Sequence, residues 1–288
     1  MTQEELQQIY EGFSVPGETE GEAFERIVGI IRFLMSEDGC PWDRVQTHDS
    51  LKKNMIEETY EVIDAINAKD DDHLEDELGD FFLQGVFHGL LGEADGSFDL
   101  SSVLNRVSDK MLFRHPHVFF PENGEKTTKT LDNALLKWEN MKQRERSEKS
   151  QTQLMSEIPR ELPALMRSNK IQKKARDVGF DWDDVKDAFE KVREETRELE
   201  EIYDSGDKQH ILEEVGDLLF SVVNVARFLD VDPEEALSYT SEKFVRRFGY
   251  IEEKTRSQGR ELTSMTLDEM DNLWEEAKER EKQEVTRE

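Results

Sequence analysis

The two halves of this chain carry the same motifs in the same order, and this internal repeat restricts the fold more than any other feature. In the first half, GCPWDRVQTHDSLKKNMIEETYEVIDAI is followed by LEDELGDFFLQGVFHGLL. In the second half, VGFDWDDVKDAFEKVREETRELEEI is followed by LEEVGDLLFSVVNVARFL. Four acids of the first half each have an acid 137 positions further along: Glu58 and Glu195, Glu61 and Glu198, Glu77 and Glu214, Asp80 and Asp217. We therefore expect two similar units in tandem.

The region between the repeats has the composition of a connection. The stretch KQRERSEKSQTQLMSEIPRELPALM is charged, contains Ser and Gln, and includes Pro159 and Pro163, which is typical of a linker leading into a second unit. We place the boundary near residue 150. The predicted organisation is an N-terminal tail over residues 1–20, a first unit over 21–150, a linker over 151–164 and a second unit over 165–288.

Hydrophobic periodicity predicts helices nearly throughout. In NMIEETYEVIDAI the apolar side chains form a broad stripe with a period near 3.6, and no strand-like alternation of useful length competes with it. The segments 78–91 and 215–229 are apolar on several faces, which indicates central helices. The expected fold class is all-α, with one small helical bundle in each half.

Composition excludes some partners. The chain has 38 basic and 67 acidic residues, a formal net charge of −29, so it lacks the basic surface that duplex nucleic acid or an anionic membrane requires. The N-terminus has no signal-peptide pattern, and no apolar run is long enough to span a membrane. The one cysteine, Cys40, can form no disulfide within the chain. We expect a cytoplasmic protein.

The repeated acids precede apolar helices, where isolated carboxylates would be unfavourable. Residues three apart on a helix project from one side, so Glu58 and Glu61 point together, as do Glu77 and Asp80. The short segment between their helices favours antiparallel packing, which brings the four carboxylates to one place. They would repel one another there unless a cation joined them. A solvated acidic face is the simpler explanation, but duplication at fixed spacing favours a metal site.

The donor set restricts the metal. Oxygen ligands suit Mg²⁺, with Mn²⁺ as a substitute, and the lack of Cys or His near the acids disfavours zinc. A ferritin-like di-iron site would need Glu-x-x-His, which does not occur in the chain. Gly79 and Gly216, each one position before the last acid, indicate a close approach to the helix at that point.

The spacing of the acids and three further motifs resemble those of a known protein family. The arrangement Glu57-Glu58-x-x-Glu61, fourteen residues, Asp76-Glu77-x-x-Asp80, and its repeat from Glu194 to Asp217, resembles the MazG family of all-α nucleoside triphosphate pyrophosphohydrolases. CPWD at 40–43, RHPHVF at 114–119 and KIQKKARDVGFDW at 170–182 are similar to the two-unit bacterial members. The likeness runs from about residue 22 onward. Asp76 departs from the family, which usually has Glu there.

The resemblance implies two tandem MazG-like bundles and Mg²⁺-dependent hydrolysis of nucleoside triphosphates between the α and β phosphorus. It also implies a homodimer and a role in nucleotide-pool control or house-cleaning. Glu58, Glu61, Glu77, Asp80 and their four counterparts would bind the metal. An adjacent acid, Glu57 or Glu194, would orient the attacking water or take its proton.

Cationic and aromatic residues are candidates for the substrate site. Lys110 and Arg114 recur as Lys243 and Arg247, 133 positions on, and such i, i+4 pairs suit a triphosphate, although they are often solvent-facing partners of Glu. Lys191 precedes the second acidic motif. The further candidates are Trp138 and Trp274, which would stack on a base or sugar unless they are core residues.

Two other functions stay open. A non-catalytic nucleotide-sensing or helical interaction module would keep the metal site for stability, and a narrower dUTP or dCTP pyrophosphatase belongs to the same superfamily. Intact acids in both halves favour catalysis, and the tandem organisation favours the broader MazG type. We expect the second unit to carry more of the turnover, because Lys191 stands where the first unit has Asn54, and Glu213 where it has Asp76.

Overall fold

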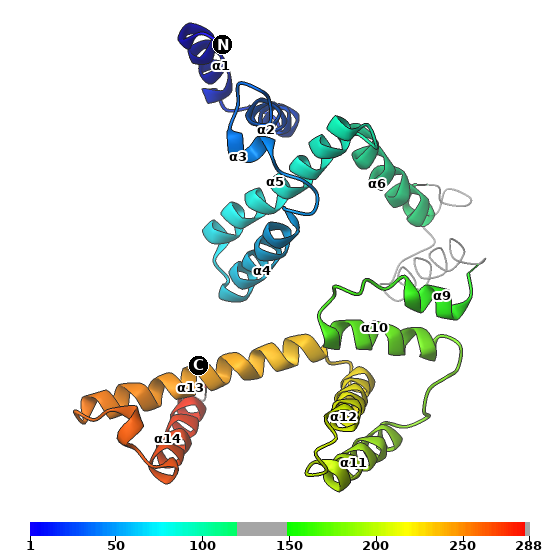
Figure 1. The fold of residues 1–288 in the computed structure, drawn as a ribbon, viewed down its shortest axis with the longest axis vertical. Helices are drawn as coiled ribbons and strands as arrows, with labels where there is room; N and C mark the ends of the chain where they lie inside the picture. Colours follow the sequence, from blue (N-terminus) through cyan, green and yellow to red (C-terminus); the bar gives the residue numbers. More distant parts are fainter. Residues whose placement is uncertain (120–148, 286–288) are drawn as a thin grey trace. The chain divides into compact units, whose positions relative to one another are not determined.

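Every regular element in the described residues is a helix, which confirms the all-α prediction. The computed structural model describes residues 1–119 and 149–285 (Figure 1). Contacts between Cα atoms divide the chain into two compact units, Met1–Arg144 and Glu145–Glu288. No helix in the described part of the chain is long and apolar enough to cross a membrane.

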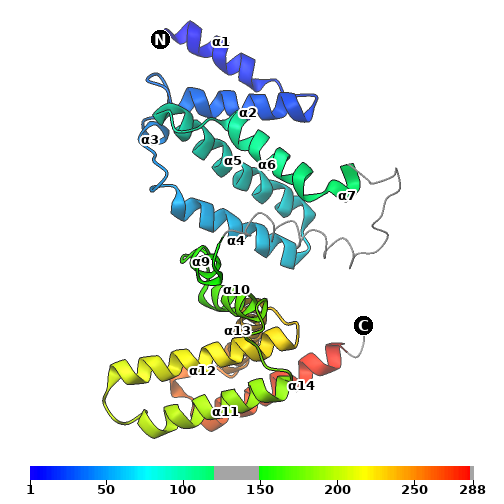
Figure 2. The ribbon, with the colours of Figure 1, turned by 90° about the vertical axis from the view of Figure 1, so that its right-hand side faces the viewer.

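The first unit contains one long helix on which several shorter helices pack. Its described helices are α1 (Gln3–Ser14), α2 (Glu20–Leu34), α3 (Pro41–Arg44), α4 (Lys52–Ala68), α5 (Asp71–Asp95), α6 (Leu100–Arg114) and α7 (Pro116–Phe119). Helix α5 contacts α2, α4 and α6, and α4 runs beside it (Figure 2). Helix α1, in the segment predicted as a tail, packs on α2 through Phe13 and Phe33, whose ring centroids are 6.4 Å apart.

A tight turn joins the two helices that carry the first acidic motif. Lys69 ends α4 in the left-handed conformation, with φ of 55°, and Asp70 caps α5 by accepting a hydrogen bond from the His73 amide. Gly206 and Asp207 occupy the equivalent turn of the second unit, where Gly206 has φ of 78°. Because glycine adopts this conformation without steric cost, the second unit has the more favourable residue. The turn makes each pair of helices antiparallel.

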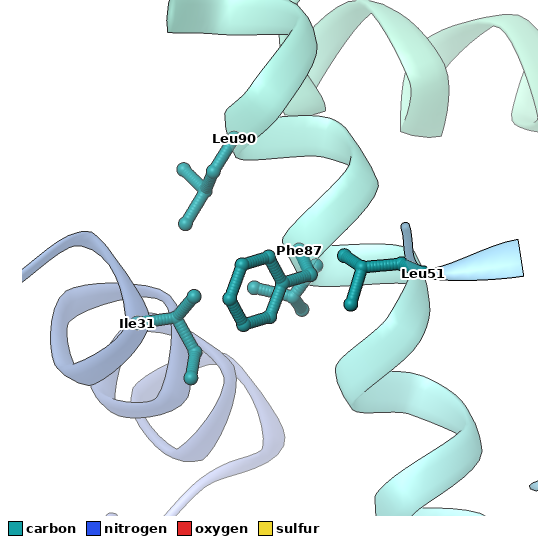
Figure 3. Packing of buried hydrophobic residues seen from close by; sticks show 5 residues of the cluster. Ile31, Leu51, Phe87 and Leu90 are labelled. Atoms are coloured by element: carbon teal, nitrogen blue, oxygen red, sulfur yellow. The ribbon is translucent and has the colours of Figure 1, made fainter. Parts of the chain in front are cut away.

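The core of the first unit is apolar. Leu51, Phe87 and Leu90 pack with Ile31 and Val86, all at most 4% exposed (Figure 3). Leu51 immediately precedes α4, Ile31 lies on α2, and the others lie on α5. Burial of such side chains contributes about 1.5–3 kcal/mol each. This cluster fixes α4 and α5 against α2 and so holds the acidic ends of the two helices in register.

The second unit repeats the central hairpin with further helices around it. Its described helices are α9 (Gln151–Ser156), α10 (Ala164–Arg176), α11 (Val185–Ile202), α12 (Lys208–Phe228), α13 (Pro233–Ser257), the short 3-10 helix η2 (Leu262–Ser264) and α14 (Leu267–Val285). Helices α11 and α12 correspond to α4 and α5, and α10 packs on α12 as α2 packs on α5. Helix α9 lies within the segment predicted as a linker and packs on α10.

The two units differ in the polarity of the central hairpin. Phe87 and Leu90 of the first unit correspond to Asn224 and Arg227, 137 positions on. The Arg227 side chain is only 5% exposed, and its guanidinium donates to both carboxylate oxygens of Asp181 and to Asn224 Oδ1. A buried arginine needs such partners to offset its desolvation. The second unit therefore fixes the segment before α11 with a polar network where the first unit uses apolar contacts.

At another pair of positions the first unit has polar residues, two histidines, where the second unit has apolar ones. Nδ1 of His48 and Nδ1 of His88 are 2.7 Å apart, and the two rings are parallel within 2°. The corresponding residues of the second unit are Val185 and Val225. Burial and the nearby His48 charge lower the pKa of His88. This pair joins the turn before α4 to the middle of α5, and it is specific to the first unit.

Candidate metal centres

The α4–α5 hairpin brings together acids from both helices in the first unit. Carboxylate oxygens of Glu58, Glu77 and Asp80 lie within 4.8 Å of one another. Burial raises the pKa of Glu58, and so do the charges of Asp80 and Glu61 and a hydrogen bond with Glu61. Glu61, the fourth predicted ligand, is thus beside the cluster without belonging to its closest group. The antiparallel arrangement predicted from the short connection is present.

The second unit has the equivalent group. Carboxylate oxygens of Glu195, Glu214 and Asp217 lie within 4.8 Å of one another, and a second group joins Glu195 to Glu194 and Glu198. Glu195 is 4% exposed, the lowest exposure among the predicted ligands with a stated value. Desolvation and a hydrogen bond with Glu195 raise the pKa of Glu198. A buried carboxylate among other carboxylates is costly unless a cation is present.

Lys191 supplies a cation at the second centre. Its ammonium group is 2.7 Å from Glu194 and 2.5 Å from Glu195. Hydrogen bonds with these two carboxylates raise the Lys191 pKa. In the first unit the nearest equivalent pair is more exposed: Lys53 is 3.0 Å from Glu57, the acid next to the predicted ligand Glu58. Both candidate proton acceptors, Glu57 and Glu194, therefore have a lysine partner.

Histidines adjoin both clusters, so the statement that the acids lack a nearby histidine was wrong. His73 Nε2 is 2.9 Å from Glu77 Oε1, and His210 Nε2 is 3.2 Å from Glu214 Oε1. Each histidine is four positions before its acid, one helical turn away, so helical spacing could have predicted both contacts. The two histidines also lie 137 positions apart, as the acids do. Nitrogen donors thus reach the edge of each centre.

The glycines before the last acids have open surroundings. A Cβ atom at Gly79 or Gly216 would meet nothing within 4 Å in the described residues. The expected close approach is therefore not made by the described part of this chain.

Three of the predicted substrate-binding residues of the second unit, Lys243, Arg247 and Trp274, lie on α13 and α14, whereas Lys191 lies on α11. Arg247 donates from Nε to Glu281 at 2.9 Å, and its guanidinium is 5.4 Å from the Trp274 ring centroid. Lys243 lies 5.6 Å from the ring of Tyr239. Within the described residues, these contacts join the three side chains to α13 and α14 and not to the acidic cluster. The structure brings the acids together and leaves Lys243, Arg247 and Trp274 as a separate group.

The first-unit counterparts are only partly described. Lys110 is exposed on α6, and Arg114 is half-buried at the end of that helix. Trp138, the predicted counterpart of Trp274, lies outside the described residues. One set of residues was missed by the sequence argument altogether: the buried network of Arg227, Asn224 and Asp181. Its signal would have been an arginine and an asparagine at positions that are apolar in the first repeat.

The donor set fits a hard divalent cation. Each centre offers three carboxylates whose oxygens lie within 4.8 Å of one another, with a further acid beside them. Oxygen ligands of this kind suit Mg²⁺, Mn²⁺ or Ca²⁺. A cation would remove the mutual repulsion that raises the pKa of Glu58. These acidic groups could therefore hold a metal in both units.

Comparison with known proteins agrees with this organisation. The family model of the MazG nucleotide pyrophosphohydrolase domain matches residues 46–119 and again residues 183–250, so each match contains one acidic cluster. The chain is 42% identical over 258 residues to the nucleoside triphosphate pyrophosphohydrolase/pyrophosphatase MazG of Thermotoga maritima, covering 90% of this chain and 96% of that protein. It is 40% identical over 262 residues to the nucleoside triphosphate pyrophosphohydrolase of Escherichia coli K12, covering 89% of this chain and 97% of that protein. A 47% identical match to the protein YabN of Bacillus subtilis covers 90% of this chain and 52% of that protein.

Proposed function

Because this chain belongs to the MazG family of nucleotide pyrophosphohydrolases, we propose that it hydrolyses nucleoside triphosphates to the monophosphate and pyrophosphate. The bond cleaved is the one between the α and β phosphates. The observation that carries the proposal is similarity over 90% of the chain to a protein named for this activity, with both acidic clusters inside the matched family domains. We assign the chain to nucleotide-pool control or house-cleaning in the cytoplasm.

We assign Mg²⁺ to the two acidic clusters, with Mn²⁺ as a substitute. The ligands are Glu58, Glu61, Glu77 and Asp80 in the first unit, and Glu195, Glu198, Glu214 and Asp217 in the second. When bound, the cation neutralises phosphate charge and activates water for attack. The hairpin turns and the buried residues behind each cluster hold the carboxylates in place before the substrate arrives, which limits the reorganisation needed for catalysis.

The acids next to the ligands take the proton of the attacking water. Glu194 is the stronger candidate because Lys191 holds it at 2.7 Å beside Glu195, which orients the carboxylate. Glu57 has the corresponding place in the first unit, held at 3.0 Å by the exposed Lys53. A general base needs both reach and fixed orientation. Because Lys191 holds Glu194 more firmly than the exposed Lys53 holds Glu57, we assign more of the turnover to the second unit.

The triphosphate and the nucleoside bind to cationic and aromatic side chains. We assign Lys243 and Arg247 to phosphate oxygens and Trp274 to stacking with the base or sugar, with Lys110 and Arg114 as the first-unit equivalents of the cationic pair. Arg247 already lies against the Trp274 ring, so the group presents a charge and an aromatic surface together. Lys191 is a further phosphate contact, because it carries its charge at the edge of the acidic cluster.

We assign a homodimer as the working form. The middle of α12 exposes Leu219, Phe220 and Val222 by 42–52%, and α13 exposes Phe244 and Val245 by 56–62%. Phe82, the first-unit counterpart of Leu219, is 65% exposed. Apolar surface of this extent on central helices supports burial against a second copy. Light scattering after size-exclusion chromatography measures the mass, and a monomer at micromolar concentration would contradict the assignment.

A panel of nucleoside triphosphates tests the activity. Each nucleotide, including dUTP and dCTP, is incubated with the protein and Mg²⁺, and the products are separated and quantified. The expected products are the monophosphate and pyrophosphate from several bases. Primary release of diphosphate and orthophosphate would reject the proposed reaction, and turnover of dUTP or dCTP alone would indicate the narrower enzyme. Binding without turnover of any nucleotide would indicate a sensor.

A further inference from the structure

A histidine contacts one predicted ligand in each acidic centre. His73 Nε2 hydrogen-bonds to Glu77 Oε1 at 2.9 Å, and His210 Nε2 lies 3.2 Å from Glu214 Oε1. The two contacts use the same atoms and the same four-residue spacing on equivalent helices. The Glu77 carboxylate can only accept, so Nε2 of His73 carries the hydrogen of that bond. Each histidine is thus close to one oxygen of a predicted ligand.

The surroundings of these histidines separate the contact from an ordinary surface ion pair. Glu77 and Glu214 are each 16% exposed, while the histidines are 47% and 49% exposed. The acid is thus the inner partner, facing the cluster, and the imidazole covers it from the solvent side. An exposed pair contributes little because both side chains are mobile. Here one partner is already held by the hairpin, so the contact acts mainly on its orientation.

The repeat provides an independent observation. Three neighbouring positions differ in charge between the repeats: Asp71 corresponds to Lys208, Asp72 to Gln209, and Glu75 to Leu212. The histidine and its acid are present in both turns despite these exchanges. The contact is therefore associated with the metal centre and not with the general charge of the helix end.

We propose that His73 and His210 are positioning residues for the metal centres, each fixing the orientation of a ligand glutamate. This inference rests on the proposed function, because it requires that the acidic clusters bind a divalent cation. Hydrogen bonds to ligand carboxylates restrict the number of ways in which the ligand can turn, and loss of such a partner typically weakens metal binding about 10- to 100-fold. The histidines themselves need not touch substrate.

Metal binding is measured one centre at a time. In the full chain, Glu77→Gln with Asp80→Asn removes the first centre, and Mg²⁺ binding to the second is then followed by isothermal titration calorimetry at a pH where imidazole is neutral. On this background His210→Ala is expected to raise the Mg²⁺ Kd about 10- to 100-fold. With the second centre removed instead, by Glu214→Gln and Asp217→Asn, His73→Ala is expected to act in the same direction.

The chain supplies a rescue variant and a matched control. Gln209 Nε2 donates to Glu213 Oε1 at 2.9 Å with the same four-residue spacing, so a glutamine amide reaches a glutamate across one turn of this helix. His210→Gln is therefore expected to keep the Kd close to that of the parent. Gln209→Ala removes the neighbouring contact to an acid that is not a predicted ligand, and it should leave the Kd unchanged. Melting in EDTA verifies that each variant is folded.

The outcomes separate the inference from the function on which it rests. If the parent chain binds Mg²⁺ and hydrolyses nucleotides while His210→Ala and His73→Ala keep the parental Kd, the positioning role is overturned and the proposed function stands. Equal weakening by His210→Ala and Gln209→Ala would also overturn it, because the effect would then be one of helix-end structure. A parent chain that neither binds Mg²⁺ nor hydrolyses nucleotides would reject both. Weakening by His210→Ala, restored by His210→Gln, supports the inference.

Discussion

Neutralising one acid of the first centre should change stability by different amounts with and without metal. The oxygens of Glu58, Glu77 and Asp80 are at most 4.8 Å apart. Two unit charges at this separation repel by ~0.9 kcal/mol at the dielectric constant of water and by ~3.5 kcal/mol at an effective value of 20. Because the hairpin end is partly exposed, the lower figure applies. Glu77→Gln removes two such repulsions and keeps an oxygen that accepts from His73.

The expected gain in the absence of metal is therefore about 2 kcal/mol in the free energy of unfolding of the first unit. For a unit of this size that raises the melting temperature by roughly 6 °C. With Mg²⁺ at a hundredfold excess over its Kd, the parent gains about 2.7 kcal/mol. A variant whose affinity falls a hundredfold gains only about 0.4 kcal/mol. The advantage of Glu77→Gln seen in EDTA should thus disappear in Mg²⁺.

Differential scanning calorimetry in EDTA and in millimolar Mg²⁺ measures both quantities on the same protein. Glu75→Gln is the control, because this exposed acid lies on the same helix turn and outside the cluster. It should shift the melting temperature equally in the two conditions. A Glu77→Gln variant that is no more stable than the parent in EDTA would show that the acids do not repel as argued. If the stability advantage of Glu77→Gln over the parent is as large in Mg²⁺ as in EDTA, Glu77 is not a ligand.

Two further predictions concern the acidic centres, and a third concerns the His48–His88 pair. Hydrolysis should stop in EDTA and return with Mg²⁺ or Mn²⁺, and full activity after thorough chelation would exclude the carboxylate centres as the site of catalysis. Glu214→Gln with Asp217→Asn should cost far more turnover than Glu77→Gln with Asp80→Asn, and equal losses in steady-state assays would indicate that the units act together. The pKa of His88 is lowered in the folded state from its ordinary value of 6.5, so the unfolded chain binds more protons below that value and the first unit should lose stability as pH falls through it. Melting curves between pH 7.5 and 5 test this, with His88→Val as the variant in which the slope should diminish.

Several features were available from the sequence because they depend on local geometry. The repeat, the helical periodicity and the three-residue spacing of the acids follow from chain positions alone, since a helix places residues three and four apart on one side. Asp70 and Asp207 at the helix starts also have a local signature. The all-α fold and the pairing of Glu58 with Glu77 and Asp80 needed only one further assumption, that a short connection makes the helices antiparallel.

Other features depended on which side chains meet across helices. The burial of Glu195 is set by the packing of α11 on α12, which no spacing rule predicts. The same is true of Arg227, whose partner Asp181 is 46 positions away in the sequence. Lys243 and Arg247 have the spacing expected of phosphate ligands, yet the structure places Arg247 beside Glu281 on the α13–α14 hairpin.

The sequence by itself determined the element types, the duplication and the residues able to bind a metal, because these follow from short-range periodicity and residue chemistry. Only the tertiary structure decided which acids of different helices converge closely and which of them are buried. The physical reason is that desolvation and Coulomb interactions depend on distances through space, and those distances are fixed by the packing of whole helices against one another.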